Sequence, residues 1–213
     1  MPDQTLAEAQ ILTRELRDSL SPQQVIELIL EGNARFASGR STRRDWVAEQ
    51  QGTAEEQFPA AVFLSCMDSR APLTAICDMG IGHAFNCRIA GNAVNDDVLG
   101  SLEYATAAAG AKLVMVLGHS NCGAILSAID NVHSGNMTIL LARFQNAIEE
   151  TEYAGERTSA NPAFVDAVAH THLRRTLWKI RERSLTLREL EAAGAIAMVA
   201  AIYDLESGRI SLI

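Results

Sequence analysis

The sequence predicts a single α/β domain built around a mainly parallel sheet. Short, nearly continuous apolar runs, such as residues 61–66 and 112–118, are typical of buried strands, and segments with apolar residues three and four apart are typical of helices. The two kinds of segment alternate, which favours parallel strands joined by right-handed helical crossovers. With 213 residues and 48% apolar content, the chain can bury roughly 70% of its unfolded surface in one domain.

Two helices are expected before the first strand. Residues 4–20 carry leucines at helical spacing, and Ser21, Pro22 and Gln24 form a capping box for a second helix that ends near Gly39. Their apolar faces must cover either this chain's sheet or a second subunit, so residues 1–40 are predicted to form a helical arm. Residues 39–58 are polar and are expected to form a loop, with a solvated basic cluster of Arg40, Arg43 and Arg44.

Strands and helices then alternate. After the strand over residues 61–66 we expect a short helix from Pro72, a strand over residues 84–90, a turn at Gly91-Asn92, a helix from its cap at Asn95 to Gly110, and a strand over residues 112–118. The second half is mainly helical, with helices predicted over residues 138–150 and 161–183 and from Thr186 to Gly194. A fourth strand over residues 195–203 and an edge strand over residues 209–213 complete a sheet with helices on both faces.

Charge and composition limit the possible functions. The chain has 26 acidic and 18 basic residues and a net charge of −8, which excludes a general attraction to nucleic acid or to anionic membranes. The first residues lack a secretory signal pattern, and the longest apolar run is short of the roughly 20 residues of a membrane helix. We therefore expect a cytoplasmic protein, whose four cysteines act as ligands or core thiols.

Reactive side chains follow two of the predicted strands. Cys66 and Asp68 come directly after one strand, and His119 and Cys122 come directly after another. In a parallel sheet the carboxyl ends of the strands line a common crevice, so these side chains can converge. Two thiolates, an imidazole and a carboxylate match zinc in ligand type and number.

Asp68 has two possible roles at such a site. It can be a fourth ligand that closes the metal site, or an acceptor that orients a zinc-bound hydroxide, and Arg70 is placed to pair with it. Spacing alone leaves a structural zinc site and a catalytic one equally open. A zinc nucleobase deaminase is excluded, because its His-x-Glu and Pro-Cys-x-x-Cys motifs are absent.

Two motifs carry a resemblance to a known family. Cys-Met-Asp-Ser-Arg at residues 66–70 together with His-Ser-Asn-Cys-Gly at residues 119–123 resembles the paired motifs of the β-class carbonic anhydrases. The segments SPQQVIELILEGNARFASG, DMGIGHAFNCRIAGNAVNDDVLGSLEYA and AIYDLESGRI are similar to bacterial members, so the resemblance covers almost the whole chain.

The resemblance implies a reaction and a site. The reaction would be the reversible hydration of CO₂ to bicarbonate and a proton, by attack of a zinc-bound hydroxide that an Asp-Arg dyad orients. Cys66, His119 and Cys122 would be the ligands of one Zn²⁺ per chain, Asp68 a fourth ligand in a closed state, and Asp68 with Arg70 the dyad. The implied CO₂ pocket comprises Gln57, Phe85, Ala90, Tyr104 and Gly123. The implied assembly is a homodimer or dimer of dimers, with the pocket at the dimer interface and the helical arm packed on the partner.

Some features differ from the family pattern. Ala90 replaces a frequent valine, and Phe63 replaces the tryptophan of the bicarbonate-regulated subgroup. Because hydrolases of CS₂ and COS share the zinc ligands, such a hydrolase remains an alternative, as does a non-catalytic, zinc-stabilised bicarbonate-sensing module. Cys77 and Cys87 are expected to be core thiols, and His170 and His172, two apart on one helix, are not expected to share a ligand face.

Overall fold

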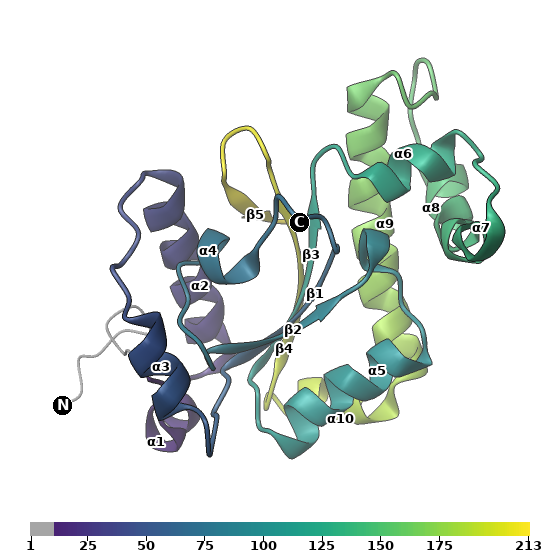
Figure 1. The fold of residues 1–213 in the computed structure, drawn as a ribbon. Helices are drawn as coiled ribbons and strands as arrows, with labels where there is room; N and C mark the ends of the chain where they lie inside the picture. The colour runs from purple at the N-terminus through teal and green to yellow at the C-terminus, as the bar shows by residue number, and fades with distance from the viewer. Residues whose placement is uncertain (1–10) are drawn as a thin grey trace.

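A five-stranded sheet forms the centre of the protein (Figure 1). The computed structural model describes residues 11–213. The strand order is β2-β1-β3-β4-β5, in which the first four strands are parallel and β5 is antiparallel to β4. The strands are β1 Ala61–Ser65, β2 Ala84–Arg88, β3 Leu113–His119, β4 Ala197–Tyr203 and β5 Ile210–Leu212. The predicted fold class, a mainly parallel sheet of four strands with an edge strand, is confirmed.

Helices cover both faces of this sheet (Figure 1). On one face lie α1 Arg14–Ser19, α2 Pro22–Ala37, α3 Trp46–Gly52 and α4 Leu73–Ile76. On the other lie α5 Asp96–Glu103, which continues into a π-helical turn at Tyr104–Ala108, and α9 Pro162–Arg183 and α10 Leu185–Ala192. Three shorter helices, α6 Gly123–Ile129, α7 Gly135–Leu141 and α8 Gln145–Glu150, lie beside α9 at one end of the sheet.

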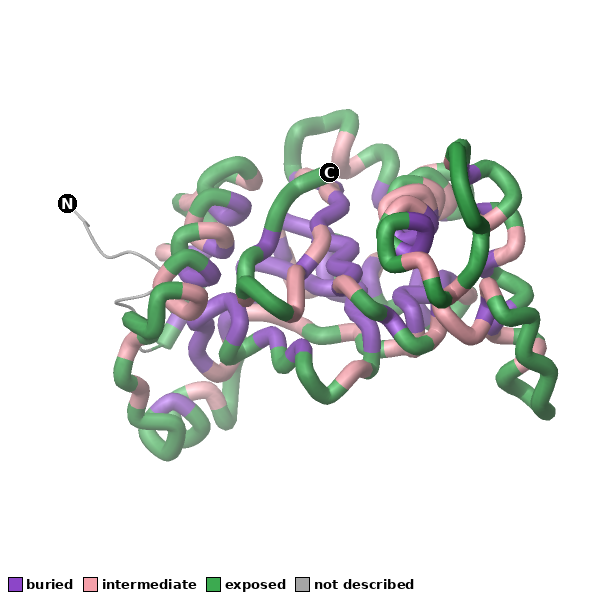
Figure 2. Tube along the Cα trace, turned by 90° about the horizontal axis from the view of Figure 1, so that it is seen from above, coloured by how far each residue is buried: buried purple, intermediate pink, exposed green. Residues whose placement is uncertain are grey.

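The two central strands are buried on both faces, as Figure 2 shows for the middle of the molecule. Side chains of β1 alternate between the two cores: Phe63 packs with α2 and α4, whereas Val62 and Leu64 pack with α5, α9 and α10. This alternation explains the continuous apolar runs of these strands, because a parallel strand between two helical layers has no solvent-facing side.

The described part of the predicted arm packs on this chain's own sheet. Val25, Ile26 and Ile29 of α2 are buried in the same core as Phe63. Asn33 also holds α2 in place. Its side-chain Nδ2 donates to the carbonyls of Ile76 and Gly208 at 3.0 and 2.9 Å, and its Oδ1 accepts from the Ile210 backbone amide at 2.7 Å. The helix predicted over residues 4–20 is described only from residue 11, and α1 begins after its cap at Thr13.

The loop predicted over residues 39–58 contains a helix, so that prediction is wrong. Asp45 caps α3 by accepting a hydrogen bond from the Ala48 amide at 3.0 Å. The expectation that Arg44 is solvated is also wrong, because its guanidinium is buried in an ion pair with Glu49 at 3.1 Å. Mutual pairing of charges allowed a polar stretch to fold against the domain.

Three helix predictions need correction in the second half. Helix α6 was not predicted, and the helix predicted over residues 138–150 is divided by a 3₁₀ turn at Ala142–Phe144. This turn directs the fully buried Phe144 ring into a core that also contains Phe164. Helix α10 is capped by Ser184, which accepts from the Leu187 amide at 3.1 Å, and not by Thr186.

None of the helices within residues 11–213 combines the length and the hydropathy that a bilayer crossing requires.

Candidate metal centre

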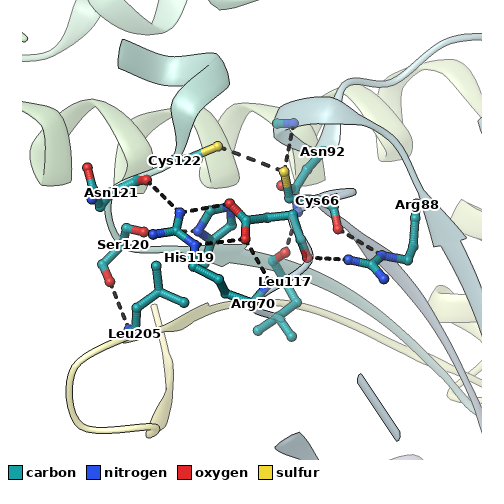
Figure 3. A network of polar contacts seen from close by, with 12 residues as sticks. Cys66, Arg70, Arg88, Asn92, Leu117, His119, Ser120, Asn121, Cys122 and Leu205 are labelled. Carbon is teal, nitrogen blue, oxygen red and sulfur yellow. Dashed lines mark hydrogen bonds and ion pairs between the residues drawn. The ribbon is translucent and has the colours of Figure 1, made fainter. Parts of the chain in front are cut away.

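The reactive residues of the two motifs meet at the carboxyl ends of β1 and β3 (Figure 3). Cys66 follows β1 directly, His119 is the last residue of β3, and Cys122 immediately precedes α6. The two strands are parallel neighbours, with Ser65 opposite Leu117, so the residues after them enter the same space. This is the crevice in which open parallel sheets place their ligands.

Three side chains form a compact buried cluster. The ligand atoms of Cys66, His119 and Cys122 lie within 4.8 Å of one another, and no other group of three such residues in residues 11–213 is arranged in this way. The two sulfurs are 4.0 Å apart. Two sulfurs bound at about 2.3 Å to one tetrahedral zinc ion would lie about 3.8 Å apart, so the observed separation fits this metal.

The His119 ring is oriented for metal binding. Its Nδ1 lies 2.9 Å from the carbonyl oxygen of Ser120, a hydrogen bond that places the proton on Nδ1 and leaves the Nε2 lone pair free. Nε2 is buried and has no hydrogen-bond partner; the nearest carboxylate oxygen, on Asp68, is 3.8 Å away. A buried nitrogen lone pair beside two thiols is what a Cys₂His zinc site requires.

The two thiols share their protons unequally. The hydrogen bond from Cys122 lowers the pKa of Cys66, helped by His119 and by the Gly91 amide and opposed by burial. The same hydrogen bond and burial raise the pKa of Cys122. One thiolate is therefore favoured before any metal arrives, and metal binding would displace the second proton.

Asp68 is paired with Arg70 and is not part of the three-residue cluster. Arg70 donates from Nε to Oδ1 at 2.9 Å and from Nη2 to Oδ2 at 2.8 Å, and its backbone amide donates to Oδ1 at 2.9 Å. These hydrogen bonds hold the pKa of Asp68 well below its usual range. The carboxylate is thus ionised and fixed in direction beside His119.

Three residues that support the cluster were not identified from the sequence. Arg88 at the end of β2 donates to the carbonyl of Cys66 at 3.0 Å and to that of Asp68. The Gly91 amide donates to Cys66 Sγ at 3.3 Å, and the Asn92 amide group donates to the carbonyls of Leu64 and Leu117 (Figure 3). The only sequence signal for this support was the predicted turn at Gly91-Asn92.

One chain does not bring the predicted pocket residues together. Ala90 adjoins Gly91, and Gly123 adjoins Cys122, so both lie beside the cluster. Phe85 and Tyr104 instead line a groove of about 670 Å³ along β2 and α5, with their rings 6.3 Å apart. Phe85 is opposite Val62, four residues before Cys66, which corresponds to about 13 Å along the strand. Gln57 is exposed before β1.

Comparison with known proteins identifies the family. Residues 61–210 match the family model described as carbonic anhydrase. The chain belongs to the carbonic anhydrase family. It is 32% identical over 191 residues to carbonic anhydrase 2 of Mycobacterium tuberculosis (strain ATCC 25618 / H37Rv), covering 89% of this chain and 91% of that protein. It is 33% identical over 198 residues to the carbonic anhydrase of Mycolicibacterium smegmatis, covering 90% and 93%. Family membership confirms the predicted resemblance and the predicted enzyme class.

Solved β-carbonic anhydrases have the same fold. A tetrameric β-carbonic anhydrase from Sordaria macrospora superposes with a TM-score of 0.68 at 22% identity, covering 89% of this chain and 96% of that chain. The Coccomyxa β-carbonic anhydrase in complex with acetazolamide gives a TM-score of 0.69 at 20% identity, covering 86% and 84%. This likeness places the chain in the β-class fold of the family.

Proposed function

We propose that this protein catalyses the zinc-dependent, reversible hydration of CO₂ to bicarbonate and a proton. The observation that carries the proposal is the buried Cys66, His119 and Cys122 cluster with the ionised Asp68–Arg70 pair at its edge. A purely structural zinc site would have no need of a carboxylate that a cation holds beside the three ligands. Family membership supports CO₂ as the substrate.

The three clustered side chains would hold the metal. Zinc supplies the Lewis acidity that makes a water molecule nucleophilic near neutral pH. Two thiolates neutralise much of the ion's charge, so protein groups near the metal must also help to stabilise the ionised nucleophile. Asp68 is the described carboxylate nearest to His119 Nε2, at 3.8 Å.

The Asp68–Arg70 pair would orient the nucleophile. An ionised carboxylate can accept hydrogen bonds but cannot donate them. Asp68 would therefore accept the hydrogen of the attacking oxygen, and a lone pair of that oxygen would then face the CO₂ carbon. Arg70 fixes the carboxylate through two side-chain hydrogen bonds, and its Nη2 also donates to the Asn121 carbonyl at 3.3 Å. Asp68, released from Arg70, would be able to serve as a fourth ligand of the metal and so close the site.

Two copies of the chain would complete the CO₂ pocket. The proposed pocket residues are Gln57, Phe85, Ala90, Tyr104 and Gly123. Ala90 and Gly123 lie beside the cluster, whereas Phe85 and Tyr104 line a separate groove along the outer strand β2. A homodimer or dimer of dimers in which that groove faces a partner's cluster would unite them, and Tyr104, with 65% of its surface exposed, is available for such contact.

The first test is CO₂ hydration by purified protein of measured zinc content, followed by stopped flow at alkaline pH. We expect about one zinc per chain and rapid hydration, both lost in Cys66→Ala because one of three metal ligands is removed. Asp130→Ala, at an exposed position after α6, is the matched control and should resemble the wild type.

Failure of this test would be informative. Hydration that persists in Cys66→Ala would refute the proposed metal site. One zinc per chain without hydration would refute CO₂ as the substrate; CS₂ and COS would then be assayed, and inactivity toward all three would favour a zinc-stabilised bicarbonate-sensing module.

A further inference from the structure

His172 is not one of the three clustered residues Cys66, His119 and Cys122, but it contacts the turn at Gly91-Asn92 that supports them. This histidine is on α9 and is buried, with 5% of its surface exposed. Its Nε2 is 2.8 Å from the carbonyl oxygen of Gly91. The spacing of the histidines in the sequence suggests no function for this residue, and the proposed mechanism does not use it.

Gly91 connects His172 to a proposed zinc ligand. The Gly91 amide donates to Cys66 Sγ at 3.3 Å, while the Gly91 carbonyl accepts from the imidazole on its other side. Both groups belong to one residue, so the orientation of its carbonyl and that of its amide are linked through two backbone dihedral angles. A group that holds the carbonyl therefore also directs the amide toward the sulfur.

The space around Gly91 allows little adjustment. The residue has φ of 60°, and a Cβ atom there would lie 2.3 Å from the ring of Phe144. The Phe144 ring in turn packs against the His172 ring, with centroids 4.5 Å apart. The turn thus packs against two buried rings, of which only the imidazole offers a hydrogen bond.

The imidazole is suited to donate without carrying charge. A carbonyl is only an acceptor, so the proton lies on Nε2, which is also 3.3 Å from Thr176 Oγ1. Burial lowers the pKa of His172 to about 4, so the ring is neutral at physiological pH. A neutral donor at this position fixes the turn without adding a positive charge that would oppose a metal cation.

We propose that His172 is a positioning residue for the metal centre: through the Gly91 carbonyl it holds the Gly91 amide against Cys66 Sγ and so strengthens zinc binding. This inference rests on the proposed function, because it assumes that Cys66 binds the metal. Hydrogen bonds that support metal ligands typically contribute about 10- to 100-fold to metal affinity. Because His172 acts on Cys66 only indirectly, through the backbone of Gly91, we expect an effect of roughly tenfold, at the lower limit of that range.

The test replaces His172 by glutamine and by leucine. Glutamine can place an amide N–H near the position of Nε2, whereas leucine fills the site without a donor. His170→Leu is the matched control, because this half-buried residue lies two positions earlier on α9 and lines a groove together with Glu150 and Arg174, which does not include His172. Zinc affinity is measured by competition with a chromophoric chelator, and the thiolate-to-metal charge-transfer band is recorded after substitution of zinc by Co²⁺.

We expect His172→Leu to bind zinc roughly tenfold more weakly and to shift the charge-transfer band. His172→Gln should recover most of the affinity, and His170→Leu should match the wild type. Wild-type affinity and spectrum in His172→Leu would overturn the proposal, as would equal losses in the leucine and glutamine variants, which would indicate that only ring packing matters. If the leucine variant does not fold, His172→Met provides the same comparison with a more flexible side chain.

The wild-type protein separates this proposal from the proposed function. A wild type without zinc would refute the proposed metal site itself. A wild type with zinc and CO₂ hydration, combined with unchanged zinc affinity in His172→Leu, would refute only the role of His172.

Discussion

Two ion pairs of similar composition lie in very different surroundings in this protein. Asp68 and Arg70 are two residues apart, and their side chains are 16% and 50% exposed. Arg44 and Glu49 are five residues apart and only 2% and 0% exposed. The first pair lies beside the cluster of Cys66, His119 and Cys122, and the second joins Glu49 of α3 to the loop before that helix.

The partners of each pair explain the difference. The second carboxylate oxygen of Glu49 accepts from the Ile81 amide at 2.8 Å, and Arg44 also donates to the Asp78 carbonyl at 2.9 Å. Opening that pair would leave buried charges unpaired, which is costly. The Asp68–Arg70 pair is partly exposed, so water can solvate Arg70 if the pair opens. Similar chemistry thus joins elements in one place and, under the proposed function, would orient the nucleophile in the other.

Asp68→Asn should have the largest effect on function and little effect on the fold. The substitution keeps the shape of the side chain but removes the anionic acceptor, so we expect CO₂ hydration to fall by about 100-fold or more, with unchanged zinc content. Arg70→Ala should also remove most of the CO₂ hydration activity and leave zinc bound, because Asp68 is then no longer held in position. Stopped-flow rates and metal analysis check this prediction, and wild-type turnover in either variant would refute the dyad.

Glu49→Ala should have the opposite profile, a large effect on stability and a small one on CO₂ hydration by the folded protein. Removing one partner of a buried ion pair leaves the other uncompensated, so the free energy of unfolding should fall by about 3–5 kcal/mol. Urea denaturation measures this change. The matched control is Glu150→Ala, which breaks a more exposed pair with Arg175 and should cost less than about 1 kcal/mol. Equal losses in the two variants would contradict the distinction between buried and exposed pairs.

His172 extends the comparison to a buried group that is kept neutral instead of paired. Burial lowers its pKa to about 4, against about 6.5 in the unfolded chain, so the unfolded state binds more protons between these values. The stabilisation that follows from keeping His172 neutral is complete above about pH 6.5. As the pH falls toward 4, the free energy of unfolding should decrease by about 3 kcal/mol. Unfolding free energies of wild type and His172→Gln should therefore converge as the pH decreases from about 7 to about 4.5. Parallel pH dependences would refute this prediction.

The sequence was sufficient to predict the sheet and the meeting of Cys66, His119 and Cys122. Strands β1 and β3 are buried on both faces and so appear as continuous apolar runs, and Cys66, His119 and Cys122 lie where those runs end. The rules that place carboxyl ends of parallel strands together then bring these residues into one site. The pairing of Asp68 with Arg70 was also predicted, from their spacing and the family resemblance, and the two side chains form an ion pair.

The sequence did not predict the contacts that depend on packing between distant segments. Residues 39–58 are polar, and only the folded domain buries Arg44 against Glu49 and forms α3. The link from His172 to Gly91 spans 81 positions, and no local periodicity records such a contact. The local sequence pattern and the strand order determined that Cys66, His119 and Cys122 form one cluster, because each residue lies at or shortly after the end of a strand. Tertiary structure alone decided which charged and polar groups are buried, because burial depends on how distant elements pack.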